Sequence, residues 1–333
     1  MGLSVDICKS FNGFTLDVKF SVEKGTIGFL GSSGSGKSMT LRCIAGLVIP
    51  DKGRIVLNDR VLFDSEKGIN VSVQERNTGF LFQNYALFPN FTVRENIAFG
   101  LKKLSKKEQA VRIEEKLEMM QLGELQNRYP SQLSGGQQQR TALARALVTE
   151  PECLLLDEPF SALDNHIRSR LEKELLETIE SYSGITVYVT HNLEECYRIS
   201  KEIVVMERGK AAAFGSRDEI FLNPPNVKAA RLTGCRNFSK VKQVSSDYVE
   251  AIDWGCQFKS TDLLEKIDNY DFIGVRDHEI KILGNINTEY TEYTEDNMLP
   301  CWLAQVIETP YKVTLYLNLK NPPENFGDYH IQT

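Results

Sequence analysis

A glycine-rich turn at residues 31–38, with the sequence Gly-Ser-Ser-Gly-Ser-Gly-Lys-Ser, limits what this chain can fold into more than any other feature. The apolar run at 26–30 before it predicts a buried strand, and residues 39–45 after it predict a helix. Glycine lets consecutive backbone N–H groups point inward around an anion, where larger side chains would crowd the approach. This succession of strand, turn and helix predicts a phosphate-binding loop in an α/β domain.

Two side chains at the end of the turn add specific chemistry. Lys37 brings a positive charge for the outer phosphates, and the Ser38 hydroxyl can bind Mg²⁺. A chance glycine-rich turn is the alternative, but such a turn does not require the flanking strand and helix. We therefore expect a nucleoside triphosphate to bind here. The expected contacts are Gly31, Ser32, Ser33, Gly34, Ser35, Gly36, Lys37, Ser38 and Met39.

Two acids and a histidine follow two further apolar runs. Residues 153–156 precede Asp157 and Glu158, and residues 185–190 precede His191. Asp157 stands where a P-loop ATPase holds Mg²⁺, and Glu158 can polarise an attacking water as general base. Solvated acids and a structural histidine are the alternatives. The carboxyl end of a strand faces the ligand crevice of an α/β sheet, which favours functional roles.

A second anion site is predicted near the middle of the chain. Residues 133–137, with the sequence Leu-Ser-Gly-Gly-Gln and here called the signature, introduce a predicted helix through residues 141–147. Ser134 and the two glycines after it expose backbone N–H groups at the start of that helix, where the helix dipole favours an anion. One chain therefore carries two phosphate-binding surfaces.

Together these motifs resemble the ATP-binding cassette of ABC transporters. The resemblance covers about residues 1–235 and implies ATP as the nucleotide with Mg²⁺ as the metal. It also implies a head-to-tail homodimer, in which the signature of one subunit caps the ATP held by the loop of the other. The motifs stand in the family's order: the loop at 31–38, Gln83, the signature, Asp157-Glu158, residues 161–164 and His191.

The resemblance implies roles for single residues. Ser38 and Gln83 would bind Mg²⁺ with Asp157 behind them, and Gln83 would also reach the attacking water. Glu158 would activate that water, and His191 would hold the γ-phosphate. The residues implied to contact nucleotide away from the loop are Ser134, Gly135, Gly136, Gln137 and Asp164.

Composition and charge narrow the class of protein further. No apolar run approaches the roughly 18–20 residues that span a bilayer, and the first residues predict no signal peptide. The seven cysteines show no Cys-x-x-Cys spacing and predict reduced thiols. A net charge of −6 without a basic stripe excludes nucleic acid as an expected partner. The resemblance implies a peripheral subunit at the cytoplasmic face of the cell membrane, bound to an integral membrane permease and served indirectly by an extracytoplasmic solute-binding protein.

Two domains are expected. An α/β P-loop ATPase cassette, with a mainly parallel sheet, would occupy residues 1–235 and include a helical subdomain at about 84–150. Within residues 236–333, the stretches 247–252 and 313–319 alternate apolar and polar side chains. They predict a small all-β domain, OB-like or TOBE-type, with an accessory or regulatory role. Within it, residues 272–280 are similar to the small β-domains that follow importer cassettes, although Asp277 replaces the usual proline.

Two groups of aromatic and apolar residues keep alternative interpretations. Phe11 and Phe14 are both candidates for stacking on adenine, and Phe11 can instead belong to the core. Tyr85, Leu87 and Phe88, soon after Gln83, can line a groove for a partner helix or pack internally.

The transported substrate is predicted from resemblance alone. Residues 53–70, and the stretch after Gln83, look like molybdate importer ATPases, so we expect an importer of an inorganic oxyanion, most of all molybdate. The alternatives are an ATPase subunit for sulfate, iron, sugar or polyamine import, and a soluble ABC ATPase without a transport role. The C-terminal domain can also be a ligand sensor. No residue of a cassette would contact the transported ion.

Overall fold

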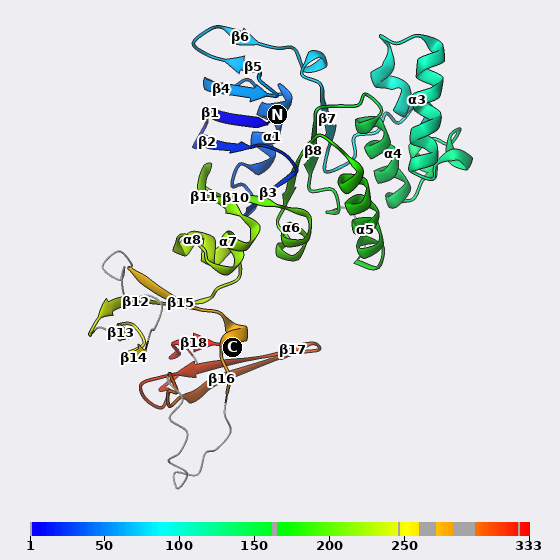
Figure 1. The fold of residues 1–333 in the computed structure, drawn as a ribbon. Coiled ribbons are helices and arrows are strands. Elements are labelled where there is room, and N and C mark those ends of the chain that lie inside the picture. The colour runs from blue at the N-terminus through cyan, green and yellow to red at the C-terminus, as the bar shows by residue number, and fades with distance from the viewer. Residues whose placement is uncertain (1, 162–164, 246, 260–270, 283–296, 326) are drawn as a thin grey trace. The chain divides into compact units, whose positions relative to one another are not determined.

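Figure 1 shows the computed structural model of the chain, which describes residues 2–161, 165–245, 247–259, 271–282, 297–325 and 327–333, with the side chains of 165–167 left aside. The chain divides into two compact units, Met1–Pro225 and Asn226–Thr333. This division falls earlier in the sequence than the boundary expected at 235, because the helix α8 (Val227–Leu232) groups with the second unit.

The first unit is built on an 11-stranded sheet in the described residues, with the order β6-β5-β4-β1-β2-β11-β10-β3-β9-β8-β7. The run β10-β3-β9-β8-β7 is parallel throughout. Its strands are β1 (Leu3–Phe11), β2 (Phe14–Val22), β3 (Thr26–Gly31), β4 (Lys52–Leu57), β5 (Arg60–Asp64), β6 (Ile69–Asn70), β7 (Thr78–Leu81), β8 (Cys153–Asp157), β9 (Ile185–Thr190), β10 (Glu202–Glu207) and β11 (Lys210–Ser216).

The expectation of a mainly parallel sheet is wrong for the other half. β1, β2, β4, β5 and β6 pair antiparallel with one another, and β2 pairs parallel with β11 on its other side. The reason is local for β1 with β2, β4 with β5 and β5 with β6, since each of these pairs is consecutive in the chain and joined by a short turn. Asn58 and Asp59 connect β4 to β5 with φ of 49° and 65°, the left-handed conformation of a two-residue hairpin turn. A parallel pair needs a longer crossover.

Some helices cover the parallel strands, and others form a separate group beyond β7 (Figure 1). α2, α3 and α4 make up that group and lie within the region predicted to be helical. Ser105 and Ser216 each form a capping box with a glutamate three residues on, at the start of α3 and α7. The helices of this unit are α1 (Lys37–Ala45), α2 (Val93–Ala98), α3 (Lys106–Met119), α4 (Gly135–Leu147), α5 (Asn165–Ser181), α6 (Leu193–Ile199) and α7 (Arg217–Leu222), with 3-10 turns η1 (Val73–Glu75), η2 (Phe99–Leu101), η3 (Gly123–Leu125) and η4 (Pro130–Gln132).

The second unit contains two small antiparallel sheets in its described residues, β14-β13-β12-β15 and β16-β17-β18. Trp254 is buried with Ala251, Leu317 and Ile331, so side chains from both sheets share one core. The expected fold class, a cassette followed by a small all-β region, is confirmed. The elements are β12 (Asn237–Gln243), β13 (Tyr248–Ala251), β14 (Cys256–Lys259), β15 (Phe272–Val275), η6 (Asp277–Glu279), β16 (Trp302–Thr309), β17 (Lys312–Asn318) and β18 (Ile331–Gln332).

A buried arginine anchors the end of α1, the helix that follows the glycine-rich turn. Arg76 has no exposed surface, and its Nη1 donates to the carbonyl oxygens of Cys43 and Ile44 at 2.9 and 2.8 Å. Its Nε donates to Val71 O at 3.0 Å. The carbonyls of Cys43 and Ile44 lie in the last turn of α1, where intrahelical donors run out; apart from Arg76, Cys43 O accepts from the cap residue Gly46 at 3.1 Å. The helix dipole favours a cation there. Arg76 therefore caps α1 from another part of the chain.

We predict that Arg76→Met lowers the free energy of unfolding of the unit by about 3 kcal/mol, because buried carbonyls lose their donors while the apolar stem stays. Urea unfolding followed by far-ultraviolet circular dichroism measures this. Lys19→Met is the matched control: Lys19 is 80% exposed in its ion pair with Asp6, so its loss changes stability by less than about 1 kcal/mol. Equal effects of the two substitutions would contradict the role of Arg76.

Candidate functional site

The glycine-rich turn lies between β3 and α1 and forms a backbone cradle. Gly34 and Gly36 have φ of 76° and 105°, in the left-handed region that favours glycine. A Cβ on Gly36 would lie 2.8 Å from Leu16 Cδ1 and 3.2 Å from Phe14 Cζ. Any larger residue at Gly36 would therefore disturb the loop. The first turn of α1 leaves backbone N–H groups for an anion, which fits a nucleotide phosphate.

Lys37 occupies the first position of α1 and is buried. Its Nζ donates to the carbonyl oxygens of Gly31 and Ser32 at 2.7 and 2.9 Å. Burial lowers the pKa of Lys37, and the negative charges of Glu158 and Asp157 oppose that shift. The ammonium group thus lies inside the loop and within the field of the acidic pair, where it can exchange a carbonyl for a phosphate oxygen.

The other loop residues differ in their surroundings. Ser32 and Ser33 are exposed, whereas Ser35 is buried. The Ser35 hydroxyl has no hydrogen-bond partner in the part of the chain that the structure describes. Met39 is partly buried and packs its side chain against the core, and its nucleotide contact stays a prediction.

Ser38 and Asp157 are 119 residues apart in the sequence, and the fold brings them together. Ser38 Oγ donates to Asp157 Oδ1 at 2.6 Å. Burial raises the pKa of Asp157, while the hydrogen bond from Ser38 lowers it. A hydroxyl and a carboxylate side by side are hard oxygen ligands of the kind that Mg²⁺ prefers. This donor set fits a magnesium ion held between the loop and the end of β8.

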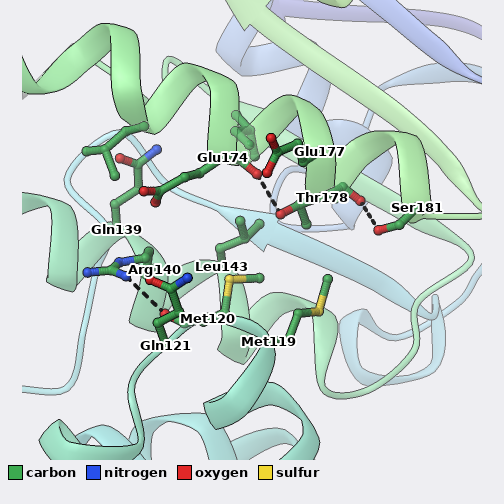
Figure 2. Close-up of a pocket in the computed structure, with 12 residues that line it drawn as sticks. Met119, Met120, Gln121, Gln139, Arg140, Leu143, Glu174, Glu177, Thr178 and Ser181 are labelled. Atoms are coloured by element: carbon green, nitrogen blue, oxygen red, sulfur yellow. Dashed lines mark hydrogen bonds between the residues drawn. The ribbon is translucent and has the colours of Figure 1, made fainter.

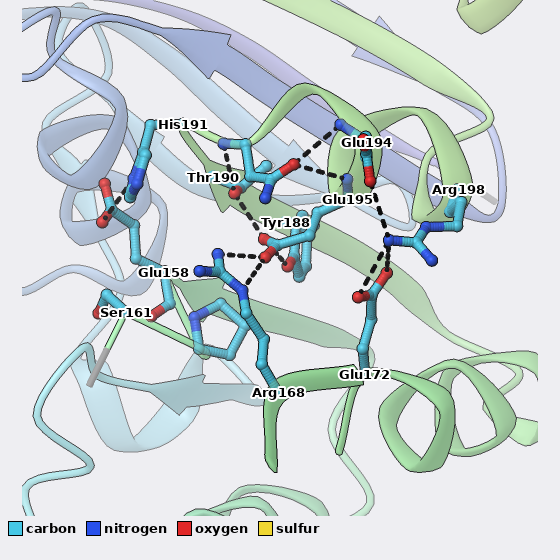
Figure 3. A network of polar contacts seen from close by, with 12 residues as sticks. Glu158, Ser161, Arg168, Glu172, Tyr188, Thr190, His191, Glu194, Glu195 and Arg198 are labelled. Atoms are coloured by element: carbon cyan, nitrogen blue, oxygen red, sulfur yellow. Dashed lines mark hydrogen bonds and ion pairs between the residues drawn. The ribbon is translucent and has the colours of Figure 1, made fainter. Parts of the chain in front are cut away.

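Glu158 lies between two further predicted residues. Its Oε2 is 3.2 Å from His191 Nδ1 and 3.5 Å from Gln83 Nε2, and Figure 3 shows the histidine turned toward the carboxylate. The backbone N–H of Glu158 donates to Val189 O on β9 at 3.0 Å. Its φ of 45° is strained for a residue other than glycine. The fold therefore holds Glu158 in a fixed, strained place beside His191 and Gln83.

The signature lies apart from these residues. Ser134 caps α4 in a capping box with Gln137: Ser134 N donates to Gln137 Oε1 at 2.8 Å, and Gln137 N to Ser134 Oγ at 3.4 Å. Ser134 and Gly135 are exposed, and Gly136 is buried against Leu171. In the described residues the signature forms no hydrogen bond with the loop at 31–38. The expected residue Asp164 lies outside the described residues.

The two candidate adenine platforms sit on one hairpin. Phe11 and Phe14 are partly buried, with ring centroids 6.1 Å apart. Phe14 reaches the glycine-rich turn at Gly36, and it also lies close to Gly209. Phe14 is thus the one of the pair placed against the loop. Stacking on adenine stays a prediction for either ring.

Sequence reasoning missed Arg145, a residue of α4. Its Nη1 and Nη2 donate to the carbonyl oxygens of Ala86 and Tyr85, each at 2.7 Å. Both of these residues have positive φ, 43° and 60°, so Arg145 stabilises a strained turn soon after Gln83. Tyr85 is buried and Leu87 packs on the core. These two residues therefore pack internally and do not line a groove for a partner helix. The only sequence signal was a cation in a helix otherwise rich in alanine and leucine.

Phe88 belongs to an exposed aromatic patch, defined here as Phe88, Phe91 and Phe99. The centroid of Phe88 is 5.3 Å from that of Phe91 and 4.3 Å from that of Phe99. The cations of Arg145 and Lys102 lie over the rings of Phe88 and Phe99, at 5.4 and 4.6 Å. Phe91 and Phe99 are exposed. Clustered aromatic rings with flanking cations are typical of a protein interface.

A cavity of about 210 Å³ lies elsewhere, between the end of α3, α4 and α5 (Figure 2). Leu143 and Thr178 are among its lining residues, and no predicted nucleotide or metal residue lines it. Gln139 Oε1 and Arg140 Nε are buried at this place without a hydrogen-bond partner in the described chain. Polar groups in a cavity of this size suit ordered water. The cavity is thus separate from the candidate catalytic residues.

Comparison with known proteins agrees with the geometry. The family described as ABC transporter matches residues 15–161. The chain is 49% identical over 230 residues to a sulfate/thiosulfate import ATP-binding protein of Synechococcus elongatus, covering 67% of this chain and 65% of that protein. It is 41% identical over 291 residues to a protein of the same name from Thermosynechococcus vestitus, covering 85% of each.

Solved structures give the same fold. The post-hydrolysis dimer of the ATP-binding cassette MJ0796 bound to ADP and Pi matches with a TM-score of 0.55 at 28% identity. The match covers 65% of this chain and 99% of that one. Among the described residues, no helix is long and apolar enough to cross a bilayer. With its loop, its acidic pair and a relative matched over most of both lengths, the chain belongs to the family of ATP-binding subunits of ABC transporters.

Proposed function

We propose that this chain is the ATP-hydrolysing subunit of an ABC importer for sulfate or thiosulfate. The observation that supports this substrate is the 41% identity, over 85% of both chains, to a sulfate/thiosulfate import ATP-binding protein. The expectation of molybdate finds no support in these relatives. Residues 53–70, on which it rested, are mostly strands β4 to β6 and their turns at one edge of the sheet. Their pattern is better explained by the hairpins of this fold than by a transported ion.

The loop and the acidic pair would bind ATP with magnesium. The cradle at 31–36 and the Lys37 ammonium would hold the phosphates, while Ser38, Gln83 and Asp157 would hold the metal. Mg²⁺, when bound, would neutralise charge on the phosphate oxygens. The support is the 2.6 Å contact between Ser38 and Asp157, because it places two oxygen ligands next to Lys37.

Hydrolysis would use Glu158 as the general base. A water would attack the γ-phosphorus, its proton would pass to a carboxylate oxygen of Glu158, and the bond from the γ-phosphorus to the bridging oxygen would break, leaving ADP and phosphate. His191 would contact the γ-phosphate. The 3.2 Å separation of His191 Nδ1 and Glu158 Oε2 supports this division of roles, because one small volume holds both side chains.

The active form would be a homodimer. The signature residues Ser134, Gly135, Gly136 and Gln137 would contact the ATP of the partner subunit, and the nucleotide contact expected for Asp164 stays a prediction. The exposure of Ser134 and Gly135 at the start of α4 supports an anion site that faces outward. A site completed by a second copy makes hydrolysis depend on closure of the dimer, a shift between two states driven by the nucleotide.

The membrane partners follow from the importer assignment. The aromatic patch would dock a helix of the integral membrane permease, which places the subunit at the cytoplasmic face of the membrane as a peripheral protein. An extracytoplasmic solute-binding protein would act on it only through the permease. The patch lies just after Gln83 in sequence, and Arg145 contacts the segment between them, so permease movement can reach the magnesium site. We assign no nucleic-acid partner.

Glu158→Gln is expected to keep ATP binding and to lower the hydrolysis rate at least about 100-fold, since the amide cannot accept the proton of the attacking water. Phosphate release by the purified chain and binding of a fluorescent ATP analogue measure the two quantities. Glu114→Gln, at an exposed carboxylate far from the loop, is the control and should hydrolyse ATP normally. Near-normal turnover by Glu158→Gln would remove Glu158 from this role.

Lys37→Ala and Ser134→Arg should fail in different ways. The first removes a phosphate charge within one subunit and weakens ATP binding. The second leaves ATP binding intact but obstructs the partner's ATP, so it blocks hydrolysis. Mixing the two inactive proteins should restore activity, because one site of each heterodimer then has both an intact loop and an intact signature. Full ATPase activity of Ser134→Arg alone, or no restoration on mixing, would contradict the head-to-tail arrangement.

Loss of this subunit should abolish high-affinity uptake of radiolabelled sulfate and thiosulfate by cells and leave molybdate uptake unchanged. Restoring the wild-type chain should restore uptake, and restoring Glu158→Gln should not. Unchanged sulfate uptake with lost molybdate uptake would return the assignment to molybdate. Loss of neither would direct the search to iron, sugar or polyamine uptake.

A further inference from the structure

A buried glutamate on α6 connects the candidate catalytic histidine to the helix that follows Glu158. Glu195 is 2% exposed, and Figure 3 shows it at the centre of a polar network. Its Oε2 accepts hydrogen bonds from Tyr188 OH at 3.0 Å and from Thr190 Oγ1 at 2.7 Å. Its Oε1 accepts from two nitrogens of Arg168, with Nε at 2.7 Å. A carboxylate with all these donors is fixed in place.

The contact with Thr190 bears directly on His191. The Thr190 hydroxyl donates to Glu195 and accepts from the backbone N–H of Asn192 at 3.0 Å. One hydroxyl therefore ties the residues on both sides of His191. Asn192 Oδ1 in turn accepts from the backbone N–H of Glu195 at 3.2 Å, which closes a ring of contacts around the histidine backbone. The His191 side chain is itself 57% exposed, so its position depends on this backbone.

The contact with Arg168 brings in α5. Ser161, which bonds to the Glu158 carbonyl through its N–H at 3.2 Å and its hydroxyl at 3.0 Å, lies shortly before that helix in sequence. Arg168 stands in the first turns of α5. Glu195 thereby joins the end of β9 to the helix that leaves the end of β8.

A second ion pair joins the same two helices and provides a matched comparison. Arg198 of α6 lies 3.0 Å from Glu172 of α5, so the polarity is the reverse of the pair between Glu195 and Arg168. Arg198 is half exposed and also lies 3.7 Å from Glu194. Within the described chain, the ion pairs of Arg198 are with Glu172 and Glu194 and involve no residue of β9. This pair can therefore hold α5 to α6 without touching the backbone around His191.

We propose that Glu195 is a positioning residue for His191, acting through the Thr190 hydroxyl and the Arg168 guanidinium. This inference rests on the proposed function, because it needs His191 to contact the γ-phosphate. The carboxylate does not touch ATP. It holds the backbone at 190–192 so that the His191 ring stays beside Glu158, and it makes that backbone move together with α5.

Substitutions can separate this role from a purely structural ion pair. Glu195→Gln keeps the shape of the side chain but leaves one acceptor oxygen instead of two. That oxygen can accept from Arg168 or from the hydroxyls of Tyr188 and Thr190, but not from both sides. Thr190→Val removes only the hydroxyl, and Thr190→Ser keeps it. Arg198→Ala breaks the comparison pair. A purely structural role predicts similar effects for Glu195→Gln and Arg198→Ala.

The experiment combines two readouts on the full chain. The sequence has four histidines, so ¹³C-labelled histidine gives a spectrum with few ring signals, and His191→Ala identifies the one of interest. We expect Glu195→Gln and Thr190→Val to shift or broaden that signal and to lower kcat at least about fivefold with an unchanged KM for ATP, since misplacement of a positioned group costs turnover. Thr190→Ser and Arg198→Ala should resemble the wild type in both the His191 ring signal and kcat.

Each outcome supports or overturns the proposal. An unchanged His191 signal and kcat in Thr190→Val, the variant least prone to misfold, would overturn it, and so would equal losses in Arg198→Ala. In a His191→Ala background, single-turnover hydrolysis should not fall further when Thr190→Val is added; a further fall would overturn the route through His191. Absence of ATPase activity in the wild type would instead reject the proposed function, and the ring signal would still test the positioning.

Discussion

Parallel pairing of β3, β9 and β8 is the constraint on which the candidate site depends. Parallel strands of one sheet finish at the same edge, so the residues that follow them meet there whatever their separation in sequence. Ser38 and Asp157 are 119 residues apart and share a hydrogen bond, and Glu158 and His191 are 33 residues apart and lie in contact. Core packing of the apolar strands thus brings the polar groups of the site together, and the hydrogen bonds then form between groups that the sheet has already placed.

This constraint explains what the sequence could predict. Apolar runs followed by the loop, the acidic pair and His191 each carry a local signal, and the parallel sheet converts those signals into one site. Arg76 and Glu195 carry no such signal, because their partners come from distant segments and a lone charge usually predicts a solvated surface. The expectation of a mainly parallel sheet was wrong for a different reason: turn residues such as Asn58 decide the pairing direction, and the patterns of the strands do not.

The transported substrate could not be predicted from the residues of the cassette, for another reason. The cassette binds nucleotide, and selectivity for an ion belongs to proteins that contact the ion. The resemblance over residues 53–70 therefore reflects only how one edge of the sheet is built. Sequence identity over most of both chains is a better guide to the transport system in which a subunit works. The second measure favours sulfate or thiosulfate.

The polar groups of the site satisfy one another in this structure. Lys37 bonds to its own loop, Ser38 bonds to Asp157, and Glu158 lies against His191. Each of these contacts uses a group that the proposed chemistry assigns to ATP, magnesium or water. In the proposed mechanism, nucleotide binding would exchange these internal contacts for ligand contacts at the ends of β3, β8 and β9 together. If Glu195 positions His191 as we propose, an exchange at His191 would be transmitted through Arg168 to α5, and a ligand that prefers one arrangement would shift all of them.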